Sequence, residues 1–336
     1  MNFVEYALQS LNDVLDEANS RLQGGAHAAA RVWPTGFEVL DRHLGGGLRS
    51  GELILLAGPQ GLGKTTWALQ AARNIALSGR SVLFFSFEHD PHALLIRLMT
   101  LEAGLAAGLK GPNLGQVRSI FESTDGWGGT VAERIEDWPG GGQALNQLGS
   151  YSQRLVLHRS TGSSTTLDII RDAVEEVRDQ TGQLPAVFVD YLQKVKVPGG
   201  PAYEDERVTL VVEGLKDLSL DADIPVVAIV AADKEGLQSG KRMRVNNLRG
   251  SSALAYEADT VLIINNKFDV VARHHLVYNT GNVERFKHWV VLTIEKNRSG
   301  KDGIDLEFHK RFEQSRFEPD GQVVAEKLVD ERVFVE

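Results

Sequence analysis

One eight-residue segment, Gly58-Pro-Gln-Gly-Leu-Gly63-Lys64-Thr65, has the residue types and the spacing of a phosphate-binding loop. Glycines leave room for backbone N–H groups to converge on phosphate oxygens, and we expect Gly58, Gly61 and Gly63 to serve this purpose. The alternative is a chance glycine turn with a surface lysine, which a full match between an apolar run and a helical pattern disfavours. The segment therefore predicts a site for a nucleoside triphosphate.

The last two residues of the loop and the residue after them would carry the chemistry. Lys64 can reach the β- and γ-phosphates, and the Thr65 hydroxyl can complete the oxygen shell that Mg²⁺ prefers. Thr66 would lie in the first turn of the following helix, where free N–H groups and the helix dipole attract an anion. The predicted ligand is ATP with Mg²⁺, and the predicted reaction is its hydrolysis.

Two acidic residues follow apolar runs that read as buried strands. Asp190 ends the run 186–190 and could hold Mg²⁺ through water; a helix cap is the alternative, and we favour the metal role. Glu88 follows the run 81–87 and could deprotonate the attacking water. It could equally cap a helix that begins at Pro91, and its position alone leaves these two roles open.

The surrounding pattern predicts the elements that position these residues. Continuous apolar runs separated by helical segments indicate an α/β fold with a mostly parallel sheet and helices on both faces. The predicted strands are 52–57, 81–87, 186–190, 225–231 and 260–264, with a closing antiparallel pair at 289–296 and 303–309. A capping box at Thr35–Glu38 is expected to open a short helix through Leu44.

The predicted domain organisation has three parts. Residues 1–30 form a helix and linker, residues 31–320 form the catalytic domain, and residues 321–336 form a C-terminal tail. The helix carries an apolar stripe that either packs on its own core or docks on a neighbouring subunit. Within the domain, the segment 125–142 is rich in glycine and contains Trp127 and Trp138, and we expect an exposed insertion there.

Composition excludes several classes of site. The 336 residues include no cysteine, which removes disulfides, thiolate zinc sites and cysteine nucleophiles. The N-terminus has no signal-peptide pattern, and no apolar run reaches the length of a membrane helix. We therefore expect a cytoplasmic protein without a membrane span. The net charge of -9 argues against a protein that coats nucleic acid, although it does not exclude a local basic stripe.

From about Trp33 to Glu318, the chain resembles the C-terminal motor domain of the DnaB-type replicative helicases, a group of RecA-like ATPases. The matching stretches fall in order: TGFEVLDRHLGGGLRSGELILLAGPQGLGKT, FFSFEHD, VFVDYLQ, NNLRGSSALAYEADTVL and EKNRSGKDGIDLEFHKRFEQSRFE. The resemblance implies a RecA-like core, ATP hydrolysis coupled to movement on single-stranded DNA, and a ring-forming homo-oligomer, expected to be a hexamer. It also implies a replication or loader protein as a partner.

The resemblance assigns roles to individual residues. FFSFEHD matches the segment whose glutamate is the catalytic base, which favours that role for Glu88. VFVDYLQ matches the Walker B motif and supports Asp190. The EKNRSGKDG match implies that Lys296 and Arg298 reach the ATP of the adjacent subunit and neutralise charge on its γ-phosphate. Without the family, these two residues would read as the solvated end of a hairpin.

The chain departs from the family pattern at three places. The family's N-terminal primase-interacting domain has no counterpart in this sequence. Ala231 stands where the family has a glutamine that senses the γ-phosphate, and Lys234 could partly replace the arginine that follows it. The family's R-E-S-G reads Arg249-Gly-Ser-Ser. These departures favour an alternative function, a RecA-like ATPase that acts as an assembly or signalling switch. A small-molecule kinase would not explain Lys296, Arg298 or the Asp190-Tyr-Leu-Gln stretch.

A basic segment at 239–250 favours nucleic acid. It contains Lys241, Arg242, Arg244 and Arg249 and no acidic residue, and in the family this region faces the central channel. Six copies in a ring would line a pore that follows a single-strand backbone electrostatically, without reading bases. The alternative is an ordinary solvated loop.

Overall fold

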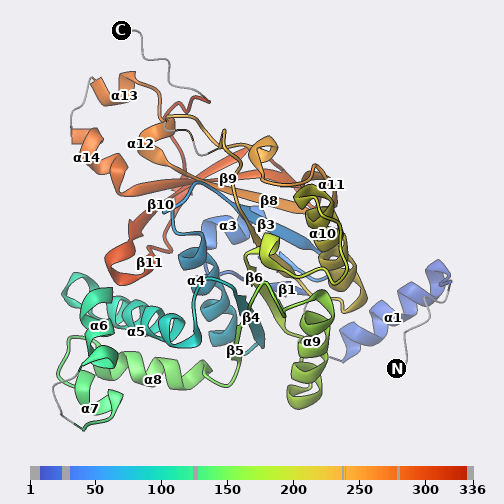
Figure 1. Ribbon diagram of the computed structural model, residues 1–336, viewed down its shortest axis with the longest axis horizontal. Coiled ribbons are helices and arrows are strands. Elements are labelled where there is room, and N and C mark those ends of the chain that lie inside the picture. The colour runs from blue at the N-terminus through green and yellow to red at the C-terminus, as the bar shows by residue number, and fades with distance from the viewer. Residues whose placement is uncertain are drawn as a thin grey trace.

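The computed structural model describes residues 8–24, 31–123, 128–236, 238, 240–277 and 281–330. A ten-stranded sheet forms its centre (Figure 1). The strands are β3 (Leu53–Ala57), β4 (Val82–Ser86), β5 (Leu155–Arg159), β6 (Ala186–Asp190), β7 (Val226–Val230), β8 (Thr260–Asn266), β9 (Trp289–Asn297), β10 (Ile304–Arg311), β11 (Arg316–Phe317) and β12 (Gln322–Val323). A separate antiparallel pair consists of β1 (Val32–Trp33) and β2 (Leu48–Arg49).

The strand order is β11-β10-β9-β8-β3-β7-β6-β4-β5, with β12 paired to β10. The strands from β8 to β5 run parallel, whereas β9 is antiparallel to β8, and β10 is antiparallel to β9. This confirms the predicted α/β, RecA-like fold with its closing antiparallel pair. Because parallel strands end at one edge of a sheet, Ala57, Ser86 and Asp190 come together there.

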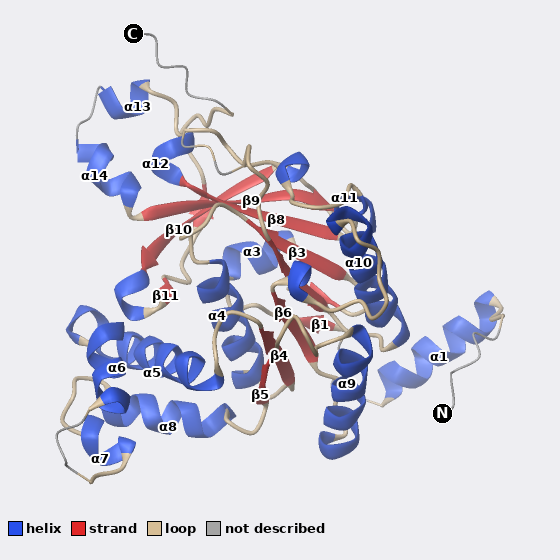
Figure 2. Ribbon diagram, viewed as in Figure 1, coloured by secondary structure: helices blue, strands red, loops and turns tan. Residues whose placement is uncertain are grey.

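Alternate residues of each strand face two different cores, because side chains of a strand point to opposite faces. On one face, Ile54 and Leu56 pack with Trp67 of α4 (Lys64–Leu77) and with α3 (Glu38–His43). On the other face, Leu53 and Leu55 pack with α9 (Leu167–Thr181) and α10 (Glu204–Asp221). Figure 2 shows helices on both sides of the sheet, as the apolar runs predicted.

The segment after β4 forms a cluster of helices. It contains α5 (Pro91–Ala107), α6 (Leu114–Glu122), α7 (Val131–Ile135) and α8 (Gly141–Tyr151). Asp90 caps α5 by accepting a hydrogen bond from the Ala93 N–H, with Pro91 in the first turn, as predicted. By length and composition the stretch Pro91–Lys110 could cross a membrane. Leu94 and Leu98 of α5 lie in the core beneath the sheet, so packing accounts for its apolar character.

The described part of the glycine-rich segment, residues 128–142, belongs to this cluster, and many of its residues are exposed. Thr130 and Glu133 form a capping box at the start of α7, and Trp138 packs against the small core between α5 and α8. A Cβ at Gly141 would lie 1.9 Å from the Ile135 carbonyl oxygen, so glycine permits the tight turn between α7 and α8. Trp127 lies outside the described residues.

Two expectations need correction. Thr35 and Glu38 form no capping box, because α3 begins at Glu38 after Phe37, which makes no side-chain cap. The Thr35 hydroxyl instead donates to Asp41 at 2.7 Å. Residues 322–330 are also more than a tail: β12 pairs with β10, and the Val329 N–H donates to the Val270 carbonyl at 2.8 Å.

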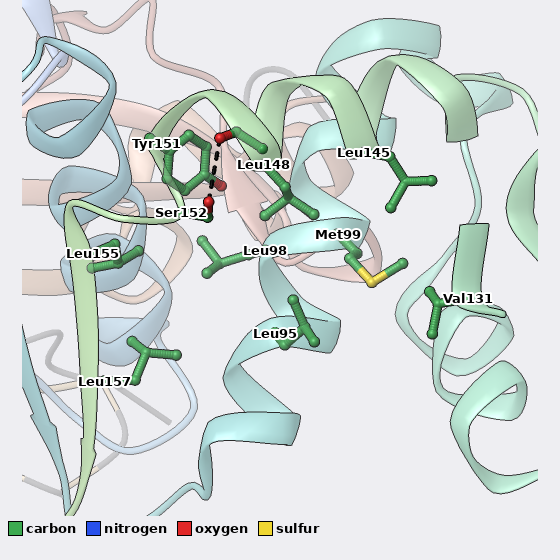
Figure 3. Close-up of a pocket in the computed structure, with 11 residues that line it drawn as sticks. Leu95, Leu98, Met99, Val131, Leu145, Leu148, Tyr151, Ser152, Leu155 and Leu157 are labelled. Carbon is green, nitrogen blue, oxygen red and sulfur yellow. Dashed lines mark hydrogen bonds between the residues drawn. The ribbon is translucent and has the colours of Figure 1, made fainter.

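An apolar groove opens between α5, α8 and the edge strand β5 (Figure 3). Leu95, Leu98 and Met99 of α5 face Leu145 and Leu148 of α8 across it, and its volume is about 410 Å³. By contrast, α1 (Leu11–Gln23) buries none of its described side chains, so the part of its apolar stripe that the structure describes is exposed. Packing of α1 on its own domain is therefore not observed among the described residues.

The remaining short elements follow β7. They are α11 (Ala253–Glu257), α12 (Lys267–Val270), α13 (His274–Val277) and α14 (Gly281–Lys287). Helix α11 packs beside α10, and α12 and α14 pack beside β9. Helix α11 precedes the start of β8, whereas α12, α13 and α14 join the end of β8 to the start of β9, where Asn266 pairs with Val290.

Candidate functional site

The phosphate-binding loop lies between β3 and α4, at the edge of the sheet where β3, β4 and β6 end. We call this the phosphate edge. A Cβ at position 58 would lie 2.5 Å from the Ile264 carbonyl oxygen, and one at position 63 would lie 2.6 Å from the Phe312 ring. Gly61 and Gly63 have φ angles of +79° and +82°, which favour glycine. The loop therefore requires glycine for both close approach and backbone conformation.

Lys64 and the first turn of α4 face the concave side of the loop. The Lys64 ammonium donates to the carbonyl oxygens of Gly58 at 2.8 Å and of Pro59 at 3.0 Å. Burial lowers the pKa of Lys64, and the nearby carboxylates of Asp190 and Glu88 oppose that shift. The first hydrogen bond of α4 runs from the Trp67 N–H to Gly63, so the amides of Lys64, Thr65 and Thr66 precede the helical ladder.

Asp190 lies directly beside Thr65. The Thr65 hydroxyl donates to the Asp190 carboxylate at 2.6 Å, although the two residues are 125 positions apart. Asp190 is only 2% exposed, and burial raises its pKa to about 6; Glu88 adds to the rise, while Thr65 and Lys64 oppose it. A hydroxyl and a carboxylate at one point are the oxygen donors that Mg²⁺ prefers, so the two residues fit the predicted metal role.

Glu88 follows β4 at the same edge. Ser86 of β4 pairs with Asp190 of β6, and the Glu88 carboxylate is close enough to influence the pKa of both Lys64 and Asp190. Its side chain is exposed. The alternative role as a helix cap falls to Asp90, which makes the capping bond of α5. Glu88 therefore retains the position of a base beside the phosphate loop.

Lys296 and Arg298 lie together at the end of β9. The Lys296 ammonium donates to the carbonyl oxygens of Ala255 at 2.7 Å and Ala258 at 2.6 Å, at the end of α11. Arg298 donates to the Asp259 carboxylate at 3.1 Å and also to the Tyr256 carbonyl oxygen. Burial lowers the pKa of Lys296, and the neighbouring Arg298 adds to that shift.

These two cations lie at the opposite edge of the sheet from their own phosphate loop. Lys296 pairs with Val261 at the start of β8, and Thr260 of β8 pairs with Ile54 at the start of β3. The loop begins only after Ala57, at the other end of β3. The first and last residues of β3, Leu53 and Ala57, are four residue steps apart, which is about 13 Å at roughly 3.3 Å per step. The family resemblance implies that Lys296 and Arg298 act as a finger that reaches the ATP of the adjacent subunit. We therefore call this second edge the finger edge, and the two residues the finger residues.

The structure corrects the reading of the basic segment 239–250. Arg242 is 5% exposed and donates to Thr293 at 2.9 Å and to Asp305, so it cannot face nucleic acid in this conformation. Arg244 pairs with Glu295 at 2.7 Å and Asp330 at 2.6 Å. Lys241 and Arg249 lie against Glu235 and Glu204, at 3.5 Å and 2.9 Å. Much of the positive charge is therefore balanced within the chain.

Comparison with protein families matches most of the chain. Residues 33–318 match the family described as the DnaB-like helicase C terminal domain. The chain belongs to this family. The matched range covers the sheet from β3 to β11, the phosphate loop and the finger residues.

Curated DnaB relatives match the same region at modest identity. The replicative DNA helicase DnaB of Haemophilus influenzae is 28% identical over 324 residues, which covers 95% of this chain and 60% of the relative. DnaB of Geobacillus stearothermophilus is 27% identical over 283 residues, covering 83% and 55%. This DnaB-like chain therefore spans 60% or less of the length of these two relatives.

Solved structures share the fold of this DnaB-like chain. A structure described as an ATPase domain has a TM-score of 0.71 at 18% identity, with coverage of 92% of this chain and 98% of that one. A DnaB-like replicative helicase, described together with its interactions with primase, has a TM-score of 0.69 at 17% identity, covering 92% and 68%. At these identities the likeness establishes the arrangement of the elements.

One connection in this DnaB-like domain was missed by the sequence reading. Ala231, where the family resemblance led us to expect glutamine, lies at the end of β7, and its N–H donates to the Gln193 side chain at 3.3 Å. Gln193 in turn donates to the Arg249 carbonyl oxygen at 2.9 Å. A glutamine from the stretch after Asp190 thus links the strand end at 231 to the basic segment. Lys234 is exposed.

Proposed function

We propose that this chain is the ATP-hydrolysing motor domain of a ring-forming DNA helicase or single-stranded-DNA translocase. The observation that carries the proposal is the division of one set of charged groups between two edges of the sheet. Lys64, Thr65, Asp190 and Glu88 lie at the phosphate edge, and the finger cations lie about one strand length away, at the opposite edge. A complete site requires the finger edge of a second subunit.

Each residue then has a distinct task. The loop amides and Lys64 bind and orient the triphosphate, while Thr65 and Asp190 hold Mg²⁺. ATP with Mg²⁺ supplies the transferable phosphoryl group. Glu88 orients the attacking water and accepts its proton. Lys296 and Arg298 of the neighbouring subunit stabilise negative charge that develops on the γ-phosphate.

We propose a homo-oligomer, a hexamer, in which α1 of one copy docks in the leucine-lined groove of the next. The described part of α1 exposes Leu11, Leu15 and Leu22, and the groove between α5 and α8 presents apolar side chains of matching character. Burial of such side chains contributes roughly 1.5–3 kcal/mol each. This contact would hold neighbouring subunits together while their nucleotide sites open and close.

The proposed nucleic-acid ligand is a single strand held by its backbone. The Arg249 side chain is 54% exposed and that of Lys241 is 32% exposed, and each pairs with one carboxylate at the surface, Glu204 and Glu235. Such surface pairs are weak enough to exchange for phosphate, whereas Arg244 is also held by the buried Glu295. Arg249 lies at the phosphate edge through its contacts with Ala231 and Gln193. A ring would repeat these cations around a pore, which suits contact without base readout. A loader or other replication protein remains part of the proposal as a partner.

The test is the ATPase rate with and without single-stranded DNA at low and at moderate salt. A DNA-driven motor predicts stimulation that fades as salt rises, because salt competes with phosphate contacts. An ATPase rate that DNA does not change at any salt concentration would contradict the proposed DNA-driven motor. It would support the alternative, a RecA-like switch that controls assembly or signalling. The replacement of the sensor glutamine by Ala231 is the observation that makes this alternative worth testing.

A further inference from the structure

Asp259 joins three parts of the fold at the finger edge. Its carboxylate accepts hydrogen bonds from the Leu53 N–H at 2.8 Å, from the Lys216 ammonium at 2.8 Å and from the Arg298 guanidinium at 3.1 Å. The backbone adds a second link, because the Arg298 N–H donates to the Asp259 carbonyl oxygen at 2.9 Å. Asp259 is therefore bonded to the start of β3, to α10 and to the finger.

Asp259 and Lys216 are buried, whereas Arg298 is half-exposed. The side chains of Asp259 and Lys216 are 9% and 12% exposed, whereas that of Arg298 is 50% exposed. A buried carboxylate with two fixed partners is a rigid acceptor, because its own rotamer is held from two sides. The half-exposed guanidinium is thus oriented by a fixed group and still presents part of its surface to solvent.

Lys296 is held by the same segment through different atoms. Its ammonium is bonded to backbone carbonyl oxygens of residues 255–258, and Arg298 also contacts the Tyr256 carbonyl. Side-chain substitutions in α11 would leave these carbonyl acceptors in place. Asp259 is the finger contact in this segment that a conservative substitution can weaken without altering the backbone.

We infer that Asp259 is a positioning residue that sets the Arg298 guanidinium for the nucleotide of the neighbouring subunit. This inference rests on the proposed function, in which Arg298 acts in trans. The carboxylate fixes the finger before the neighbour arrives, so less orientational freedom is lost when the shared site forms. Asp259 contacts neither nucleotide nor water in this scheme and acts only through Arg298.

The experiment is the Asp259→Asn variant, assayed alone and in mixed rings. Asparagine keeps the shape of the side chain but weakens its bond to the guanidinium, and misplacement of about 1 Å can cost roughly 10²-fold in rate. We expect turnover to fall about 10²-fold while the affinity for a non-hydrolysable ATP analogue stays the same. The Lys216→Met variant is the matched control, because it removes the buried ion pair while the Leu53 N–H still holds the Asp259 carboxylate and Arg298 keeps its bond to it.

Mixed rings distinguish a role at the neighbour's site from a structural role. Asp259→Asn subunits retain a complete phosphate edge, and Glu88→Gln subunits retain a complete finger edge. Mixing the two inactive variants should restore turnover at interfaces that combine the intact halves. The reference is a mixture of Arg298→Ala with Glu88→Gln, and we expect both mixtures to recover to a similar extent.

Each result has a defined meaning. Recovery in the reference mixture without recovery in the Asp259→Asn mixture overturns this inference and leaves the proposed function standing. A reference mixture that stays inactive contradicts the trans arrangement itself, and the inference falls with it. Loss of turnover in Lys216→Met equal to that in Asp259→Asn also overturns the inference. If Asp259→Asn alone is unstable, the double variant with Lys216→Met removes the unpaired buried ammonium and takes its place in every assay.

Discussion

The phosphate edge and the finger edge of the sheet hold their charged groups by different means. At the phosphate edge, backbone amides, glycines and the Thr65–Asp190 pair form a concave site that prefers an anion and a divalent cation. At the finger edge, two cations project from a strand end and are held by carbonyl oxygens and by Asp259. The first edge has the donors that bind a ligand, and the second leaves the Arg298 side chain 50% exposed at the surface.

This difference teaches that one chain carries both halves of the site but cannot bring them together. The two halves are fixed at opposite ends of the same strands, so bending the domain would not close the gap of about one strand length. In the proposed function, association of identical subunits would solve the problem, because the finger edge of one copy would meet the phosphate edge of the next. Substitutions at the two edges should therefore have separable effects.

The largest expected effect separates binding from turnover. Arg298→Ala should lower the ATPase rate by about 10³–10⁵-fold, the range found for an arginine that stabilises transferring phosphate, with affinity for an ATP analogue nearly intact. Lys64→Ala should lose both binding and turnover, because Lys64 lies within the loop itself. Steady-state ATPase rates and analogue titrations measure the two quantities. If Arg298→Ala and Lys64→Ala lost the same amount of nucleotide affinity, Arg298 would have to contact the nucleotide of its own subunit. That result would contradict the separation of the two edges.

An intermediate effect should distinguish a buried cation that stabilises the fold from an exposed cation that is available to bind DNA. Arg242→Ala should lower the free energy of unfolding by about 1.5–3 kcal/mol, because it removes a buried, charged hydrogen-bond donor from Asp305. Arg249→Ala is the matched variant at an exposed pair and should cost less than about 1 kcal/mol. It should instead flatten the salt dependence of single-strand binding. Urea unfolding and binding at several salt concentrations check both statements; similar unfolding curves for the two variants would contradict them.

The smallest expected effect concerns pH at the phosphate edge. The pKa of Asp190 is raised from its ordinary value to about 6, so the folded protein holds a proton that the unfolded chain releases near pH 4. The free energy of unfolding should therefore fall as pH rises from about 4 to 6 and level off above that. Asp190→Asn should remove this slope and add up to about 3 kcal/mol at pH 7.5. Thermal unfolding from pH 4 to 8 measures the change.

The same titration should affect ligand binding in the opposite sense. Below pH 6, protonated Asp190 loses its affinity for Mg²⁺, so Mg²⁺-dependent nucleotide binding should weaken about tenfold per pH unit. Arg298→Ala should show an unchanged pH profile for binding, because it lies at the other edge. A profile without a break near pH 6 in the parent protein would argue against Asp190 as the metal carboxylate.

The parallel core and the phosphate loop could be predicted from sequence because their signals are local. Continuous apolar runs mark β3, β4, β6, β7 and β8, and a glycine pattern marks the loop between β3 and α4. Strand β5 was missed, because Leu155–Arg159 is a half-buried edge strand that ends in polar residues. The sequence reading also did not predict the helices within 128–142, since a sequence does not show which backbone atoms approach each other closely.

The basic segment was misread because its partners are distant in the chain. Arg242 bonds to residues 51 and 63 positions away, and Arg244 bonds to Asp330, 86 positions away. A run of cations without a nearby acid looks free, yet folding brings carboxylates from three other elements beside it. The same non-locality hid the role of Asp259, whose three partners come from β3, α10 and the end of β9.

The pairing of β12 with β10 has a practical consequence for anyone who shortens or tags this protein. Removing residues 321–330 would remove Val323 and Gln322 from their partners Leu306 and Glu307, leaving unpaired amides and carbonyls along β10. An exposed strand edge of this kind pairs with strands of other molecules. The resulting aggregates would elute early in size-exclusion chromatography and would be mistaken for ring-shaped oligomers. Purification handles therefore belong after Asp330, where the strand remains covered.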